Sequence, residues 1–291
     1  MLTWKETQRE EGKKILSLSW PISIALIAQM SMGLVDMMMV GPFGAHALAA
    51  MAAALNIEVI LGVVPRNAGA GVIPLVSQAW GANKKETTYA ILRHLFTIGF
   101  FLQIPFLFGL YHVDTILRFL GQPAEIVDLA TSYCRICMCG VPFGMGYYYL
   151  RYWLQAISIV KPATWAVIVA NVANVGLNFV LIYGPFGMGV LGCAWSTVLC
   201  QMLQFLLLLY WTRSNISFRG VGSSIRTVFV YGVFSGIQIA LEVWGFACAT
   251  IMAGWLGEVA LAAHSITLQL TSISFMIVLG ISLGVSTRVG I

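Results

Sequence analysis

Eight apolar stretches, each long enough to cross a lipid bilayer as a helix, occupy most of this 291-residue chain. An α-helix needs about 20 mostly apolar residues to span a hydrocarbon core about 30 Å thick. The stretches lie near residues 15–40, 47–76, 90–111, 126–149, 163–184, 190–211, 228–254 and 259–287. Several exceed the minimum length, so tilted helices are expected. The pattern predicts an all-α integral membrane protein of about eight transmembrane helices.

The scarcity of charge excludes a water-soluble globule of this size. Only 9% of the residues are Asp, Glu, Lys or Arg and 59% are apolar, whereas soluble domains carry about 25% charged residues. The first 14 residues are polar, and the apolar run after them is longer than that of a cleavable signal. We interpret this run as a retained first span. The lipid bilayer is therefore the expected partner of most of the surface.

The basic residues fall almost entirely in alternate linkers. If the N-terminus is cytoplasmic, thirteen Lys and Arg residues lie in inside segments, Arg118 alone lies outside, and Arg66 and Arg135 fall within spans. Because basic residues concentrate in cytoplasmic loops, this split predicts a multi-pass protein of the cell (inner or plasma) membrane with both termini inside. The net charge of +5 is expected to face anionic lipid headgroups, and no nucleic-acid partner is expected.

A weak internal repeat divides the chain into two unequal parts. Residues 41–50 (GPFGAHALAA) match residues 254–263 (GWLGEVALAA) at an offset of 213, and Gly81 matches Gly290 at an offset of 209. One repeat unit therefore holds six spans, an even number that preserves orientation, so the units are parallel repeats as in several transporters. The second unit stops after two spans. The repeat predicts that four further helices are missing from a C-terminally truncated chain.

The repeat also predicts the domain boundaries. We expect a cytoplasmic N-terminal segment at 1–14, a complete six-helix lobe at 15–212, a cytoplasmic linker at 213–227 and a partial second lobe at 228–291. No linker is long enough for a separate soluble domain.

An ordered series of motifs resembles one transporter family. The motifs are Gly33-Leu-Val-Asp36 with Val40-Gly-Pro-Phe-Gly44, Ser77-Gln-Ala-Trp-Gly81, Leu150-Arg-Tyr-Trp-Leu-Gln155 with Lys161-Pro162, Asn174-Val-Gly-Leu-Asn178, and Leu261-Ala-Ala-His264 with Arg288-Val-Gly290. The set resembles the multidrug and toxic compound extrusion (MATE) family in its NorM-like branch. The resemblance implies two six-helix lobes and secondary active antiport, which exports amphipathic, often cationic drugs or toxins in exchange for H⁺ or Na⁺.

Polar stripes lie on the first and fifth spans. The residues of each stripe share one helix face: Gln29, Gly33 and Asp36 on the first span, and Asn171, Asn174 and Asn178 on the fifth. At 1.5 Å per residue, Asp36 and Asn178 lie at similar depth in the outer part of one lobe. This arrangement suits a water-filled cation pocket, although asparagines also hold helices together. The family resemblance implicates the matching aspartate in proton or cation coupling, which favours the pocket.

Two glutamates lie within spans, where each charge costs about 2.5–3.5 kcal/mol on insertion scales. Glu242 lies near the middle of the seventh span. A carboxylate there can bind H⁺, Na⁺ or a cationic drug, but not two at once, and the resemblance implicates this position in coupling. Glu58 lies deep in the second span, where the family is usually apolar, and cavity lining and structural pairing both stay open. We interpret Arg66 as extending to the inner interface.

No enzyme is expected, because the chain lacks His-Glu-x-x-His, Gly-x-Ser-x-Gly and P-loop motifs. No cofactor or resident metal is expected beyond the transported H⁺ or Na⁺, and the cysteines at 134, 137 and 139 are interpreted as small buried side chains. The expected ligands are small organic cations or amphipathic drugs, and no obligate protein partner is evident. Two alternatives stay open, a lipid-linked oligosaccharide flippase of the same superfamily and a non-transporting truncated fragment.

Overall fold

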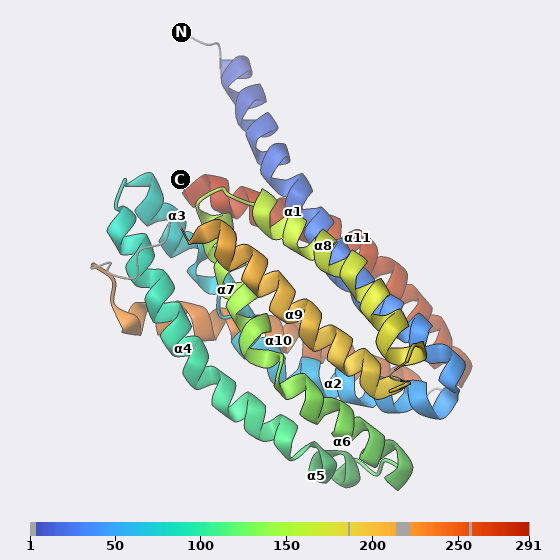
Figure 1. Ribbon diagram of the computed structural model, residues 1–291. Coiled ribbons are helices and arrows are strands. Elements are labelled where there is room, and N and C mark those ends of the chain that lie inside the picture. The colour runs from blue at the N-terminus through green and yellow to red at the C-terminus, as the bar shows by residue number, and fades with distance from the viewer. Residues whose placement is uncertain (1–3, 186, 214–221, 256–257, 291) are drawn as a thin grey trace.

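The computed structural model describes residues 4–185, 187–213, 222–255 and 258–290, and these are helical almost throughout. The long helices are α1 (Trp4–Val40), α2 (Ala45–Asn67), α4 (Lys85–Tyr111), α6 (Ala124–Met138), α7 (Val141–Ala156), α8 (Lys161–Asn178), α9 (Val190–Thr212), α10 (Ile225–Trp255) and α11 (Glu258–Gly290). Shorter elements are η1 (Gly41–Phe43), η2 (Ala70–Val72), α3 (Ile73–Gly81), α5 (Val113–Phe119) and the π-helix η3 (Phe179–Tyr183). Figure 1 shows them as one elongated bundle.

The helices confirm the prediction of an all-α membrane fold. Within the described residues, seven helical stretches are long and apolar enough to cross a bilayer, and the α6–α7 pair makes an eighth if its two bent halves form one span. These eight stretches coincide with the eight apolar runs of the sequence. The two matched ranges of the internal repeat, 41–50 and 254–263, each lie where one long helix ends and the next begins, between α1 and α2 and between α10 and α11.

The structure adds detail to two predicted segments. Residues 4–14, in the predicted cytoplasmic N-terminal segment, are helical and continuous with the first span in α1, which extends beyond the bundle in Figure 1. The predicted span 126–149 is two helices, α6 and α7, bent by 54°. Gly140 precedes α7 and Pro142 lies in its first turn, and because proline lacks an amide hydrogen the regular ladder of hydrogen bonds is interrupted there.

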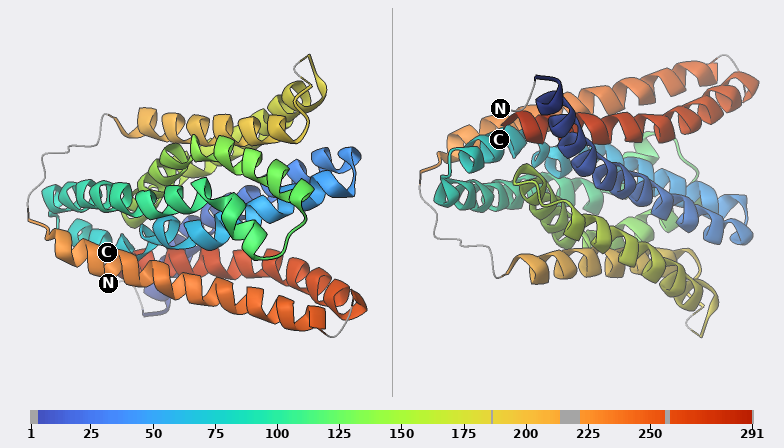
Figure 2. Two further views of the ribbon diagram at one scale, coloured as in Figure 1. Left: turned by 90° about the horizontal axis from the view of Figure 1, so that it is seen from below. Right: turned by 90° about the horizontal axis from the view of Figure 1, so that it is seen from above.

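The bundle has two sides that flank a central group of helices. Figure 2 shows α10 and α11 (orange and red) together on one side, and α8 and α9 (yellow to gold) on the other. Helix α1 packs against both α11 and α8, and α2 packs against both α10 and α6. The core between them is filled by side chains such as Tyr149 and Trp153 of α7, which are almost fully buried.

Small residues allow α11 to lie directly against α1. A β-carbon added to Gly280 would collide with Ser23, and one added to Gly284 would collide with Ser19. Ser23 Oγ also donates a hydrogen bond to the carbonyl of Ile277 at 3.3 Å. Close approach through small residues is the usual basis of helix association in membranes. The two described helices of the predicted second lobe are thus tightly packed on the first.

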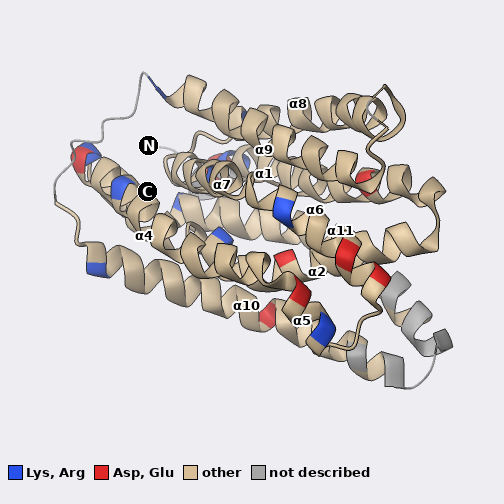
Figure 3. Ribbon diagram, turned by 60° about the horizontal axis from the view of Figure 1, so that its bottom comes forward, with Lys and Arg blue, Asp and Glu red and all other residues tan. Residues whose placement is uncertain are grey.

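The outer surface is that of a protein in lipid. Large apolar side chains such as Phe100, Val172 and Phe179 are 64–71% exposed, which a water-soluble surface does not favour in such number. Figure 3 shows Lys and Arg gathered toward the end of the bundle that carries the two termini, while Asp and Glu prevail toward the other end. The charge separation read from the sequence is therefore a property of the folded molecule.

Candidate functional site

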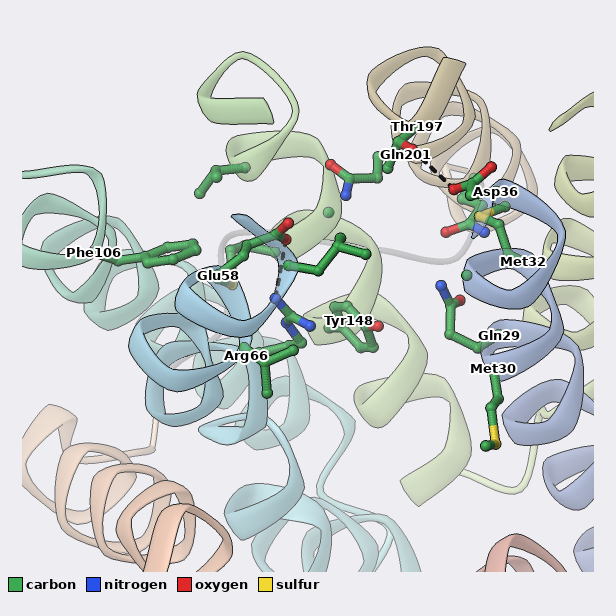
Figure 4. Close-up of a pocket in the computed structure, with 17 residues that line it drawn as sticks. Gln29, Met30, Met32, Asp36, Glu58, Arg66, Phe106, Tyr148, Thr197 and Gln201 are labelled. Carbon is green, nitrogen blue, oxygen red and sulfur yellow. Dashed lines mark hydrogen bonds and ion pairs between the residues drawn. The ribbon is translucent and has the colours of Figure 1, made fainter. Parts of the chain in front are cut away.

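A cavity of about 320 Å³ lies among α1, α2, α4, α7 and α9 in the predicted first lobe. Figure 4 shows Asp36 and Gln29 on one side, Glu58 and Arg66 on the other, and Tyr148 and Gln201 between them. The remaining wall is mostly apolar, with Met32, Leu55 and Phe106 among its side chains. Few polar groups in an apolar concave wall are typical of small-molecule sites.

Asp36 is the most heavily hydrogen-bonded group of the cavity. One carboxylate oxygen, Oδ1, accepts hydrogen bonds from Asn178 Nδ2 at 2.6 Å and Asn174 Nδ2 at 3.0 Å. The other, Oδ2, accepts one from Thr197 Oγ1 at 3.3 Å. Asp36 is 4% exposed and both asparagines are fully buried. All three donors are neutral, so a cation bound in the cavity would supply the only opposite charge among these contacts.

The structure joins Asp36 to Asn174 and Asn178, whereas Asn171 makes a different contact. Its Nδ2 donates to the carbonyl of Ala28 on α1 at 3.0 Å. Thr164 makes a similar bond to the carbonyl of Pro21 at 3.0 Å. These two bonds fix α8 against α1 and so set the register that places Asn174 and Asn178 opposite Asp36. Asn171, predicted as cavity lining, therefore bonds to backbone between helices and is not among the residues that line this cavity.

Asn174 and Asn178 also differ from the predicted lining. They hold Asp36 from the side of α8 and do not line the cavity themselves. A further bond links Asn178 Nδ2 to Asn174 Oδ1 at 3.3 Å. The asparagine stripe therefore orients the Asp36 carboxylate from one side, and the cavity lies on the other side of this carboxylate.

Glu58 lines the cavity and forms an ion pair with Arg66. Arg66 Nη2 lies 3.2 Å from Glu58 Oε1, and the guanidinium carbon lies 5.8 Å from the centre of the Tyr148 ring. Gly62 lies between the paired residues on α2, and a β-carbon there would approach both Arg66 and Phe106 to 3.0 Å. The interpretation of Arg66 as extending to the inner interface is wrong, because its guanidinium turns into the cavity toward Glu58.

Helix α9 supplies a polar face that sequence reasoning missed. Thr197, Gln201 and Gln204 all line the cavity. Their spacing of i, i+4, i+7 is the same signal that identified the stripe on α1. Gln204 is 2% exposed. Within the described part of the chain, Gln204 Nε2 and the Oε1 atoms of Gln201 and Gln29 are buried and have no hydrogen-bond partner.

Glu242 does not line this cavity. It lies near the middle of α10, as predicted, with an exposed side chain. The two carboxylates predicted to couple ions, Asp36 and Glu242, therefore do not share this cavity. Among the described residues there is no group of three or more His, Cys, Asp or Glu side chains that could hold a metal.

Comparisons with known proteins agree with the fold and the motifs. The sequence profile of the MatE family matches residues 21–180 and 235–291. The multidrug resistance protein NorM of Photobacterium profundum is 26% identical over 298 residues, covering 97% of this chain and 65% of the relative. The probable multidrug resistance protein NorM of Agrobacterium fabrum is 30% identical over 295 residues, covering 96% and 63%. The chain thus spans less than two thirds of the length of these relatives.

Solved structures show the same fold at lower sequence identity. The eukaryotic MATE transporter AtDTX14 superposes with a TM-score of 0.86 at 22% identity, over 97% of this chain and 65% of that protein. A MOP superfamily transporter from Pyrococcus furiosus superposes with a TM-score of 0.85, also at 22% identity, over 95% and 63%. The family profile covers most of the chain, and the motif series, the helices and the fold all agree with it: the chain belongs to the MatE family of MATE transporters.

Proposed function

We propose that the protein is a secondary active antiporter that exports amphipathic organic cations in exchange for H⁺ or Na⁺. The observation that carries the proposal is Asp36, a buried carboxylate held by neutral donors at the wall of a largely apolar cavity. An organic cation needs an apolar wall for its body and a negative group for its charge.

Antiport follows from competition for the carboxylate. Burying an unpaired charge is costly, so Asp36 is stabilised by either a proton, a metal cation or an organic cation. Because each ligand neutralises the same group, binding of one disfavours the others. An ion gradient then releases the drug on one side of the membrane. Glu242 is proposed as a second coupling carboxylate, on its position in α10 and the family resemblance.

The flippase alternative fits the cavity less well. A lipid-linked oligosaccharide carries a pyrophosphate, which basic residues would bind. This cavity holds Arg66, but that guanidinium is already paired with Glu58, and Asp36 faces the same space. The sign of the charge in the pocket bears on the ligand, because the Pyrococcus furiosus transporter is described as having a binding pocket of reverse polarity that suggests a different function. The acidic balance of the present cavity favours a cationic ligand.

A transport assay tests the proposal. The full-length protein, reconstituted into vesicles, is expected to move ethidium across the membrane when a pH or Na⁺ gradient is imposed, and not without a gradient. Ethidium fluorescence with trapped DNA reports the movement, and vesicles without protein are the control. Glu242→Gln is expected to lose the gradient dependence. Movement of ethidium that is indifferent to both gradients in the unchanged protein would overturn the antiporter proposal.

The orientation of the chain is a further expectation, with both termini on the cytoplasmic side. It is tested with single cysteines in two exposed loops, Ala82→Cys after α3 and Gln122→Cys before α6. In intact cells a membrane-impermeant maleimide is expected to label Gln122→Cys and not Ala82→Cys, with labelling of Ala82→Cys only after lysis. The unchanged protein measures the background from its own cysteines. The reverse pattern would place the N-terminus outside.

A further inference from the structure

The cavity contains two carboxylates but only one uncompensated negative charge. Among the described residues, Asp36 accepts hydrogen bonds from neutral side chains alone. Glu58, across the cavity, is paired with the guanidinium of Arg66 at 3.2 Å. With both carboxyls ionised, the three groups sum to one negative charge. A ligand with one positive charge therefore neutralises the cavity, and a ligand with two would leave it positive because Arg66 already compensates Glu58.

Arg66 is held in the cavity rather than free to leave it. Its guanidinium is paired with Glu58 and lies over the ring of Tyr148, a favourable position for a cation. The side chains of Arg66 and Glu58 are 25% and 15% exposed. Separating such a half-buried pair would leave two unpaired charges, which is strongly unfavourable. Arg66 thus acts as a fixed positive charge at the wall opposite Asp36.

We infer that Arg66 is a specificity-determining residue that restricts this cavity to ligands with one positive charge. The inference rests on the proposed function and concerns its substrate class. A monovalent cation places its charge against Asp36. A second charge on the same ligand would extend toward the far wall, where Arg66 repels it and occupies the carboxylate of Glu58. Like charges repel more strongly inside a protein cavity than in open water, so the resident guanidinium disfavours a dication.

Ethidium and propidium test the inference, because they share one aromatic amine core and carry one and two fixed positive charges. Their binding to the purified full-length protein is measured by fluorescence. Arg66→Gln leaves two uncompensated carboxylates, so the affinity for propidium relative to ethidium is expected to rise on the order of tenfold or more. Arg66→Lys keeps the positive charge and is expected to keep the original ratio.

Two further variants separate charge from shape. The double variant Glu58→Gln with Arg66→Gln restores one negative charge and is expected to return the propidium-to-ethidium ratio to that of the unchanged protein. Glu58→Gln alone leaves Arg66 without its partner and is expected to weaken both ligands, propidium more. Glu58→Gln also tests the inference if Arg66→Gln does not fold.

An unchanged ratio in folded Arg66→Gln, or in Glu58→Gln if that protein alone folds, overturns the inference. The inference is also overturned if the double variant keeps the propidium-to-ethidium ratio of Arg66→Gln. The room left by the smaller side chain, and not the charge of the cavity, would then determine which ligand binds. These results leave the antiporter proposal intact. Failure of the unchanged protein to bind ethidium would instead overturn the proposed function, and the inference with it.

Discussion

Replacing Asp36 by asparagine is expected to abolish export of ethidium while the folded protein still reaches the membrane. The change removes the one negative charge in the cavity that has no cationic partner among its hydrogen bonds. It leaves the size of the side chain almost unchanged. Survival of a drug-sensitive host on ethidium and gradient-driven ethidium movement in vesicles are the measurements, and both are expected to be lost. The amount of folded protein is followed by size-exclusion chromatography.

The fold is expected to tolerate this substitution because amide–amide hydrogen bonds can replace part of the network. The carbonyl oxygen of the substituted side chain can still accept from Asn178, and the α1–α8 contacts through Asn171 do not involve this position. Asp128→Asn is the matched control, since it removes a carboxylate from an exposed pair with Arg118 at 3.4 Å and is expected to leave export unchanged. Undiminished export by Asp36→Asn would remove Asp36 from the coupling mechanism.

Replacing Gly236 by leucine is expected to lower the thermal stability of the protein by several degrees. Gly236 lies in α10 where that helix meets α2, and a β-carbon there would approach the carbonyl oxygen of Val64 to 2.6 Å. Because the obstacle is backbone, the two helices must move apart. Overpacking of this kind typically costs about 1–3 kcal/mol. The midpoint of thermal unfolding in detergent, read by fluorescence-detected chromatography, is the measurement.

Gly245→Leu provides the matched comparison on the same helix. Gly245 is also in α10, but a β-carbon there would meet no atom within 4 Å. Leucine is a better helix former than glycine by up to about 1 kcal/mol, so this variant is expected to be unchanged or more stable. Equal losses of stability at both positions would mean that the close contact of α10 with α2 does not decide the effect.

Depth along a helix could be read from the sequence, but the direction of a long side chain could not. The stripes on α1 and α8 placed Asp36 and Asn178 at similar depth in one lobe, and in the structure Asn178 Nδ2 lies 2.6 Å from Asp36 Oδ1. Arg66 has several rotatable bonds, and only the positions of Glu58 and Tyr148 decide that it turns into the cavity. Asn171 shares a face with Asn174, yet it bonds to the α1 backbone whereas Asn174 bonds to the Asp36 carboxylate.

The sequence by itself determined that lipid surrounds the chain and where its spans lie, because a bilayer requires long apolar helices and each span is a local property of about 20 residues. The ordered motifs of the sequence indicated the family. The tertiary structure alone decided which helices enclose the cavity and that the Glu58–Arg66 pair lies across it from Asp36. These features depend on contacts between residues far apart in the chain. Such contacts follow from packing between helices, which no local pattern of apolar residues specifies.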